Sequence, residues 1–330
     1  GPPSAPGGPP RDPSVRVEPP SHCAGGGCPV AAYGGVPQLT IANTRVKIRD
    51  IPIWFGSSVG PQFSFEMRYT RLDDRSRSNQ AWAIGYKWQH AYSAYVETAG
   101  TNKFFHAGGG YRCQFAAVGD GTYTEKLGSG RVSSDGKYFM RDSGSNLTIS
   151  IRGGGEYEFE PDGSGSRHRL IAVRDSVGAA LRVHYDANNR ISFVATASSN
   201  VFNFSYSSSG YLTNVFDVTG NRAAVFAYTN DLLAQVTDMG GQTFKYGYDS
   251  EGKLTALSRP NLTGFDTTTI GYTGTAAGDL FSLNEGGGSC GSLAQAVEEP
   301  GTGQEAAGDV IHGAGSAQAR VRGRVPDPPS

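Results

Sequence analysis

The sequence has little net charge and no long apolar run. Its 330 residues contain 29 Lys and Arg against 30 Asp and Glu, for a formal net charge of -1. This balance gives no electrostatic reason to bind nucleic acid or an anionic membrane surface. No apolar run approaches the ~18 residues of a transmembrane helix, so we expect no membrane span. The chain begins with Gly and shows no signal peptide, so we expect a segment of a longer protein.

The four cysteines match no zinc pattern, because no second pair of Cys or His stands near them. Cys23 and Cys28 bracket a Gly-rich stretch that a disulfide would close, whereas Cys113 and Cys290 stand alone. Four unrelated thiols fit this spacing as well, so the redox compartment stays open.

Aromatic residues are missing from both ends of the chain. Ten of the 18 prolines lie in residues 1–37, the first aromatic residue is Tyr33, and the last is Phe281. Segments of this composition bury too little apolar surface to offset the entropy cost of ordering. We therefore expect disordered segments at 1–36 and 282–330, and we expect that the fold forms without them.

Apolar and polar residues alternate between these ends. Residues 63–69 read Phe-Ser-Phe-Glu-Met-Arg-Tyr, and residues 202–206 read Phe-Asn-Phe-Ser-Tyr. A period of two is typical of half-buried strands. Clusters of Gly, Asn, Asp and Ser separate the runs at hairpin spacing. The sequence therefore predicts an all-β fold of stacked antiparallel hairpins, with an N-terminal β region at 37–160.

A 21-residue repeat runs through residues 161–281. Leu or Ile recurs at positions 170, 191, 212, 233 and 254, and Val or Leu follows three residues later in each unit. In the last four units, the residue two positions before this Leu or Ile tolerates a left-handed turn. These residues are Asn189, Gly210, Asp231 and Gly252. Each unit is predicted to be a hairpin whose outgoing strand ends in a tyrosine: Tyr185, Tyr206, Tyr228 or Tyr248. Neighbouring hairpins must stack to bury a shared face.

The repeat strings resemble the YD repeat of the Rhs family. Asp follows the tyrosine in two units, at Asp186 and Asp249, while the other two units have Ser207 and Thr229. Upstream, residues 61–69, 85–92 and 157–163 resemble the entering strand, the Gly-Trp-x-x-x-Tyr segment and the Pro-Asp-Gly lead of the family. The resemblance covers roughly residues 35–272.

The resemblance implies a shell. Rhs and related insecticidal-toxin proteins wind YD hairpins into a hollow β-cocoon around a C-terminal toxin, with an N-terminal β region plugging one end. Teneurins use a similar barrel at animal cell surfaces. We therefore expect a structural fragment of such a shell, secreted or at the cell surface, whose partner is the toxin or effector domain of its parent chain. The alternative is an adhesion or carbohydrate-binding module that contacts glycans or cell-surface proteins.

Residues suited to catalysis form no recognisable constellation. Two Gly-x-Ser-x-Gly matches, at Ser58 and Ser289, lack the strand and helix that flank a nucleophile elbow. His168 and His184 flank one repeat, and the aspartates of the repeat recur in equivalent turn positions. Recurrence favours turn capping, because Asp side chains bond their own backbone two residues on. We predict no enzyme, no cofactor and no metal site, and we expect the repeat tyrosines to pack between hairpins.

An incomplete shell is expected to associate with itself. The last strand, near residues 267–272, would leave an open edge whose unpaired backbone groups are a template for another strand. The inner face, lined by residues such as Leu212, Val215, Leu233 and Val236, would also lack cover. A net charge of -1 supplies little repulsion.

Overall fold

The computed structural model describes ten stretches of the chain. They are residues 37–42, 45–56, 60–70, 84–108, 112–126, 138–152, 154–261, 263–272, 280–285 and 294–295. Ser58, Ser289, Cys23, Cys28 and Cys290 lie outside the described residues, so the expectations that concern them stay untested.

The N-terminal part forms a small sheet. Its elements are β1 (Gln38–Ala42), β2 (Arg45–Asp50), β3 (Trp54–Phe55), β4 (Phe63–Ser64), β5 (Met67–Thr70), β6 (Trp88–His90) and the 3-10 turn η1 (Ala91–Ser93). The order β1-β2-β5-β6 is antiparallel throughout, while β3 pairs only with β4 among the described strands. β25 (Ala294–Gln295) adds parallel to β1. We call β1, β2, β5 and β6 the N-terminal sheet.

The next eight strands close into a ring. They are β7 (Tyr95–Ala99), β8 (Asn102–His106), β9 (Arg112–Gly119), β10 (Thr122–Lys126), β11 (Tyr138–Asp142), β12 (Leu147–Ile151), β13 (Glu156–Pro161) and β14 (Arg167–Arg174). Each pairs with the next. The first half of β14 returns to β7, through residues 167–169, and its second half pairs with β15 through residues 172–174. The forked strand β14 therefore joins the ring to the repeats.

Five hairpins follow β14 in one continuous antiparallel ladder. Hairpin 1 is β15 (Ala180–Tyr185) and β16 (Ile191–Ala195), and hairpin 2 is β17 (Val201–Tyr206) and β18 (Leu212–Asp217). Hairpin 3 is β19 (Arg222–Thr229) and β20 (Leu232–Thr237), hairpin 4 is β21 (Thr243–Tyr248) and β22 (Leu254–Asn261), and hairpin 5 is β23 (Gly264–Tyr272) and β24 (Leu280–Glu285). The prediction of an all-β fold built from antiparallel hairpins is confirmed.

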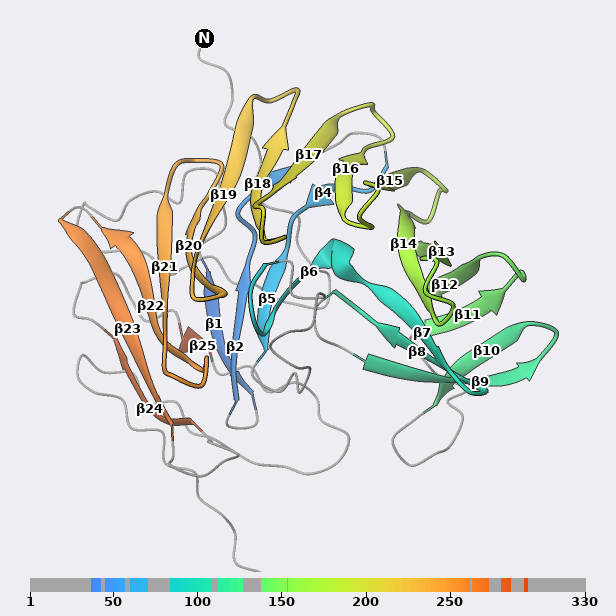
Figure 1. Cartoon of the computed structure of the whole chain (residues 1–330), viewed down its shortest axis with the longest axis horizontal. Coiled ribbons are helices and arrows are strands. Elements are labelled where there is room, and N and C mark those ends of the chain that lie inside the picture. The colour runs from blue at the N-terminus through green and yellow to red at the C-terminus, as the bar shows by residue number, and fades with distance from the viewer. Residues whose placement is uncertain are drawn as a thin grey trace, which may run out of the picture.

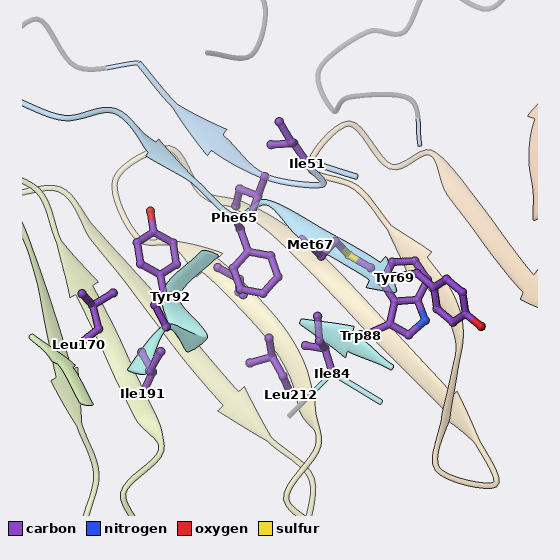
Figure 2. Packing of buried hydrophobic residues seen from close by; sticks show 14 of the residues in the cluster. Ile51, Phe65, Met67, Tyr69, Ile84, Trp88, Tyr92, Leu170, Ile191 and Leu212 are labelled. Atoms are coloured by element: carbon purple, nitrogen blue, oxygen red, sulfur yellow. The ribbon is translucent and has the colours of Figure 1, made fainter. Parts of the chain in front are cut away.

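The hairpins form a curved sheet that holds the N-terminal sheet in its concavity (Figure 1). In hairpin 2, Phe202 and Phe204 face inward and are buried, while Asn203 and Ser205, which alternate with them, are exposed. Figure 2 shows side chains of the two parts facing each other, with Phe65, Met67 and Trp88 on one side and Leu212 on the other. This shared interface is therefore one part of the core, which continues into the ring of β7–β14.

The N-terminal sheet corrects the expectation of an uncovered inner face. Leu212, Val215, Leu233 and Val236 are all 0% exposed. They lie in one continuous cluster with N-terminal residues such as Phe65. The resemblance implied an N-terminal β region that plugs one end of the shell, but the residues alone did not show which hairpins it would cover.

We expected the chain to be disordered from residue 282 onward. Strand β24 extends into this segment, and strand β25 lies within it. β24 completes hairpin 5 by pairing with β23, and β25 pairs with β1 through two residues. No helix among the described residues has the length and hydropathy to cross a membrane.

Candidate functional site

The repeat tyrosines connect neighbouring hairpins through their hydroxyl groups. Each hydroxyl donates a hydrogen bond to the backbone carbonyl of the apolar repeat residue one unit earlier, at 2.6–2.9 Å. The pairs are Tyr185 to Leu170, Tyr206 to Ile191, Tyr228 to Leu212, Tyr248 to Leu233 and Tyr272 to Leu254. We call these five bonds the tyrosine ladder. The repeat predicted tyrosines that pack between hairpins, but it did not reveal their acceptors, although both partners follow the repeat.

A β-bulge directs each ladder tyrosine toward its acceptor. In all five hairpins the strand register shifts between the tyrosine and the residue before it, and the extra residue of the bulge lies on the return strand. A bulge bends the strand, increases its twist and redirects the side chain. The ring then packs against the core while its hydroxyl reaches the previous unit. Desolvation raises the pKa of Tyr185, Tyr206, Tyr228 and Tyr248, so these hydroxyls stay protonated as donors at neutral pH.

The turns beside the tyrosines contain the four residues that the repeat singles out. Their φ angles are all positive: 60° at Asn189, 88° at Gly210, 65° at Asp231 and 77° at Gly252. In hairpins 1 and 4, the Asp after the tyrosine accepts two turn N–H groups with one carboxylate oxygen. In hairpin 2 the hydroxyl of Ser207 accepts one. These turns are therefore closed by local side-chain bonds.

At the opposite end of the hairpins, the recurring aspartates cap turns. Asp175, Asp217 and Asp238 each accept the N–H of the residue two positions on, at 3.0, 3.1 and 2.8 Å. Ser199 has a φ of 65° and takes the place that Gly178 and Gly241 hold in other units. These contacts give the aspartates a backbone role in each unit, as their recurrence predicts.

Trp88 fastens the N-terminal sheet to the ladder. Its indole N–H donates to the hydroxyl of Tyr248 at 2.7 Å, and that hydroxyl donates to the carbonyl of Leu233 at 2.8 Å. The hydroxyl of Tyr69 accepts the N–H of Leu254 at 3.0 Å. Tyr248 is thus both a ladder tyrosine and an acceptor for the N-terminal sheet.

The turn of hairpin 3 is shorter by one residue and contacts the segment before β6. Four residues separate Tyr228 from Leu233, whereas five separate the tyrosine from the apolar residue in hairpins 1, 2 and 4. Gly85, with a φ of 95°, lies so close that a Cβ there would stand 2.9 Å from the N of Leu233. Tyr86 N–H donates to the carbonyl of Asp231 at 3.3 Å. The shorter turn leaves room for this approach.

Aromatic rings fill the rest of the interface. Phe63 stacks on Phe202, with ring centres 3.6 Å apart and an interplanar angle of 3°. Phe65 meets the edges of Phe204 and Phe226 at 5.7 and 5.5 Å. Edge-to-face pairs such as those of Phe65 add to the gain from burial. One aromatic ring of the N-terminal region therefore spans hairpins 2 and 3.

A buried carboxyl group lies in the same interface. Asp50, 2% exposed, accepts the hydroxyl of Tyr246 at 3.1 Å on Oδ2. Desolvation, with a smaller contribution from nearby Asp238, raises the pKa of Asp50 to about 7. This buried carboxyl group therefore changes between its protonated and ionised forms near neutral pH.

Other titratable residues stay apart. His184 stacks on Phe193 with ring centres 4.1 Å apart. His168 lies near Lys103 and Asp142, and burial lowers its pKa. Cys113 is buried, and its thiol donates to the carbonyl of Gln114 at 3.7 Å. Among the described residues, no three His, Cys, Asp or Glu side chains gather as metal ligands.

Comparison with known proteins identifies the repeat region. Residues 138–285 match the family model described as Teneurin YD-shell, a stretch that runs from β11 through all five hairpins. None of the curated proteins compared with the chain matches it.

Proposed function

Since residues 138–285 match the Teneurin YD-shell family model, we propose that this chain forms the opening part of an encapsulating shell. In this proposal, the shell surrounds a C-terminal toxin or effector domain of the parent protein. The described residues act by confinement, and the proposal assigns them no catalytic step. The recurring aspartates, which a catalytic reading would require, are engaged by their own turns.

The observation that carries the proposal is the occupied concavity. The inward residues of hairpins 2 and 3 are buried against the N-terminal sheet, so this part of the shell encloses its own chain. A cargo would therefore lie beyond hairpin 5, on the side away from the ring of β7–β14. The N-terminal sheet would seal the shell at its beginning.

The adhesion alternative receives less support from the ladder. The hydroxyls of Tyr185 and Tyr206 are bonded to backbone, and their rings are covered by Arg169 and Arg190 at 4.4 and 4.8 Å. Rings covered in this way offer little surface for stacking a sugar.

A protease-protection assay tests the proposal. The protein to be assayed is the parent protein, expressed from the longest reading frame that contains this chain. We expect its C-terminal domain to resist a protease that digests the same domain expressed alone. Phe65→Ala, which weakens the seal, should increase cleavage, whereas Val177→Ser should not, because Val177 is 85% exposed in a turn. Equal digestion of the domain inside the parent and in isolation would refute encapsulation.

A further inference from the structure

In the units around hairpins 1 and 2, an arginine covers the ladder tyrosine. The guanidinium group of Arg169 lies 4.4 Å from the ring centre of Tyr185 and forms an ion pair of 2.7 Å with Glu160. Twenty-one residues later, Arg190 lies 4.8 Å from the ring centre of Tyr206 and pairs with Asp186 at 2.7 Å. The shell thus twice combines a tyrosine face, a guanidinium group and a carboxylate.

Hairpin 3 departs from this arrangement. The next position in the 21-residue series is Tyr211, which stacks on Tyr228 with ring centres 4.9 Å apart and an interplanar angle of 27°. A shallow, open cleft of about 420 Å³ lies beside these rings. Its polar and aromatic lining includes Ser207, Ser209, Tyr211, Tyr228, Asn230 and Asp231.

The lining of this cleft is acidic and aromatic. None of its residues is basic, and its charged member is Asp231. The hydroxyl of Tyr228 is held by the ladder bond to Leu212, which keeps the ring in place. The cleft therefore combines aromatic rings with one carboxylate, which Asp231 supplies from the turn and not from the position of Asp186, and its lining supplies no cation.

We propose that this cleft binds an arginine side chain of a partner polypeptide. A guanidinium group is planar, stacks on aromatic faces and matches a carboxylate with two N–H groups. The precedent lies in the same fold, where Arg169 and Arg190 make both contacts with their own units. The hydroxyl and amide groups of the rim would accept the remaining guanidinium N–H groups. This inference is independent of the cargo and of the shell proposal.

The open geometry predicts weak binding of a single arginine. A cation–π contact at an exposed site contributes little to binding, and more where it is desolvated. We therefore expect a dissociation constant in the millimolar range for one arginine residue. A partner would reach higher affinity by contacting the surface on either side of the cleft.

Titration with blocked tripeptides tests the proposal on the whole chain. The probe is N-acetyl-Gly-Arg-Gly-amide, and the matched control replaces arginine by citrulline, which has nearly the same shape without the charge. We expect saturable NMR shifts at the amides of residues 207–213 and 228–231 with the arginine peptide, and at least tenfold weaker binding of the citrulline peptide. Equal binding of the two peptides, or saturable shifts with neutral sugars alone, would overturn the proposal.

Two variants locate the effect without disturbing the turn. Tyr211→Arg introduces the residue type that Arg169 and Arg190 provide at the equivalent positions of hairpins 1 and 2. The new side chain would keep the ring of Tyr228 covered and would fill the cleft with the protein's own cation. Asp231→Asn keeps a residue that tolerates positive φ, as Asn189 does in hairpin 1. We expect each variant to keep the parent melting temperature and to lose binding of the arginine peptide at least fivefold. Unchanged binding in both variants would also overturn the proposal.

Discussion

The tyrosine ladder and the concave face hold the same hairpins together over very different distances along the chain. The hydroxyl bonds of the ladder join residues 15 to 18 positions apart. The hydrogen bonds between the N-terminal sheet and hairpin 4 join residues 160 to 196 positions apart. Local contacts repeat with the sequence, whereas long-range contacts occur once each. A repeated unit can therefore be recognised from its sequence, while the partner that buries its inner face cannot.

The largest effect is expected on the concave face. Phe65 is fully buried and touches rings of hairpins 2 and 3, so Phe65→Ala should lower the free energy of unfolding by about 3–5 kcal/mol. Phe265, on hairpin 5, is 40% exposed, and Phe265→Ala serves as the control with a loss below about 1 kcal/mol. Urea denaturation followed by circular dichroism measures both. Similar losses in the two variants would mean that the N-terminal sheet contributes little to the fold.

The second effect concerns the proton on Asp50. Because burial raises its pKa to about 7, the folded protein retains a proton that the unfolded chain has released between about pH 4 and pH 7. The contribution of Asp50 to stability is therefore greatest below pH 4 and falls as the pH rises through 7. Over this range the loss amounts to at most about 4 kcal/mol, at 1.36 kcal/mol for each pH unit.

Asp50→Asn isolates this contribution, since it keeps the shape of the protonated carboxyl group and cannot ionise. The groups that face Asp50 are Asp238, Arg49 and Tyr246, and all three are unchanged in this variant. We expect the variant to match the parent near pH 4 and to exceed it in unfolding free energy at pH 8. A difference that is constant with pH would show that Asp50 is ionised in the folded state throughout.

The sequence predicted the hairpins and turns that repeat along the chain, but it did not reveal the long-range contacts that occur only once. The 21-residue spacing predicted the hairpins, and the residues it assigned to the turns have positive φ in the structure. It could not place Trp88 on Tyr248, because no second copy of that contact exists. The forked strand β14 was missed for the same reason, since its pairing with β7 depends on backbone register. The late position of Tyr228 was a visible signal of the shorter turn, and the structure places Gly85 against that turn.

The third prediction compares two ladder tyrosines. Tyr185→Phe removes one hydrogen bond to a carbonyl and should cost about 1 kcal/mol. Tyr248→Phe leaves both the indole N–H of Trp88 and the carbonyl of Leu233 without this partner, so we expect about 2–3 kcal/mol. Thermal unfolding of the two variants measures the difference. Equal losses would show that the bond from Trp88 adds nothing to the ladder.

The smallest effects are expected at the tyrosine turns. Gly210 has a φ of 88°, and a Cβ there would meet nothing within 4 Å, so backbone strain is the only cost of a substitution. Gly210→Val should lose about 1–3 kcal/mol, because β-branched residues rarely adopt this conformation. Gly210→Asn should change the free energy of unfolding by less than about 0.5 kcal/mol, since Asn tolerates it. Equal effects of Val and Asn would show that this position does not require a left-handed residue.

Gly252 turns this local test into a test of the N-terminal segment. Its φ of 77° is similar, but a Cβ would stand 2.9 Å from the ring of Tyr86 and 3.4 Å from Leu232. Gly252→Asn should therefore cost about 1 kcal/mol more than Gly210→Asn, because Tyr86 must move away from hairpin 4. Adding Tyr86→Ala should remove that extra cost in a double-mutant cycle, since the two changes share one contact. Equal losses of unfolding free energy for Gly252→Asn and Gly210→Asn in the presence of Tyr86 would show that Tyr86 does not contact this turn in solution.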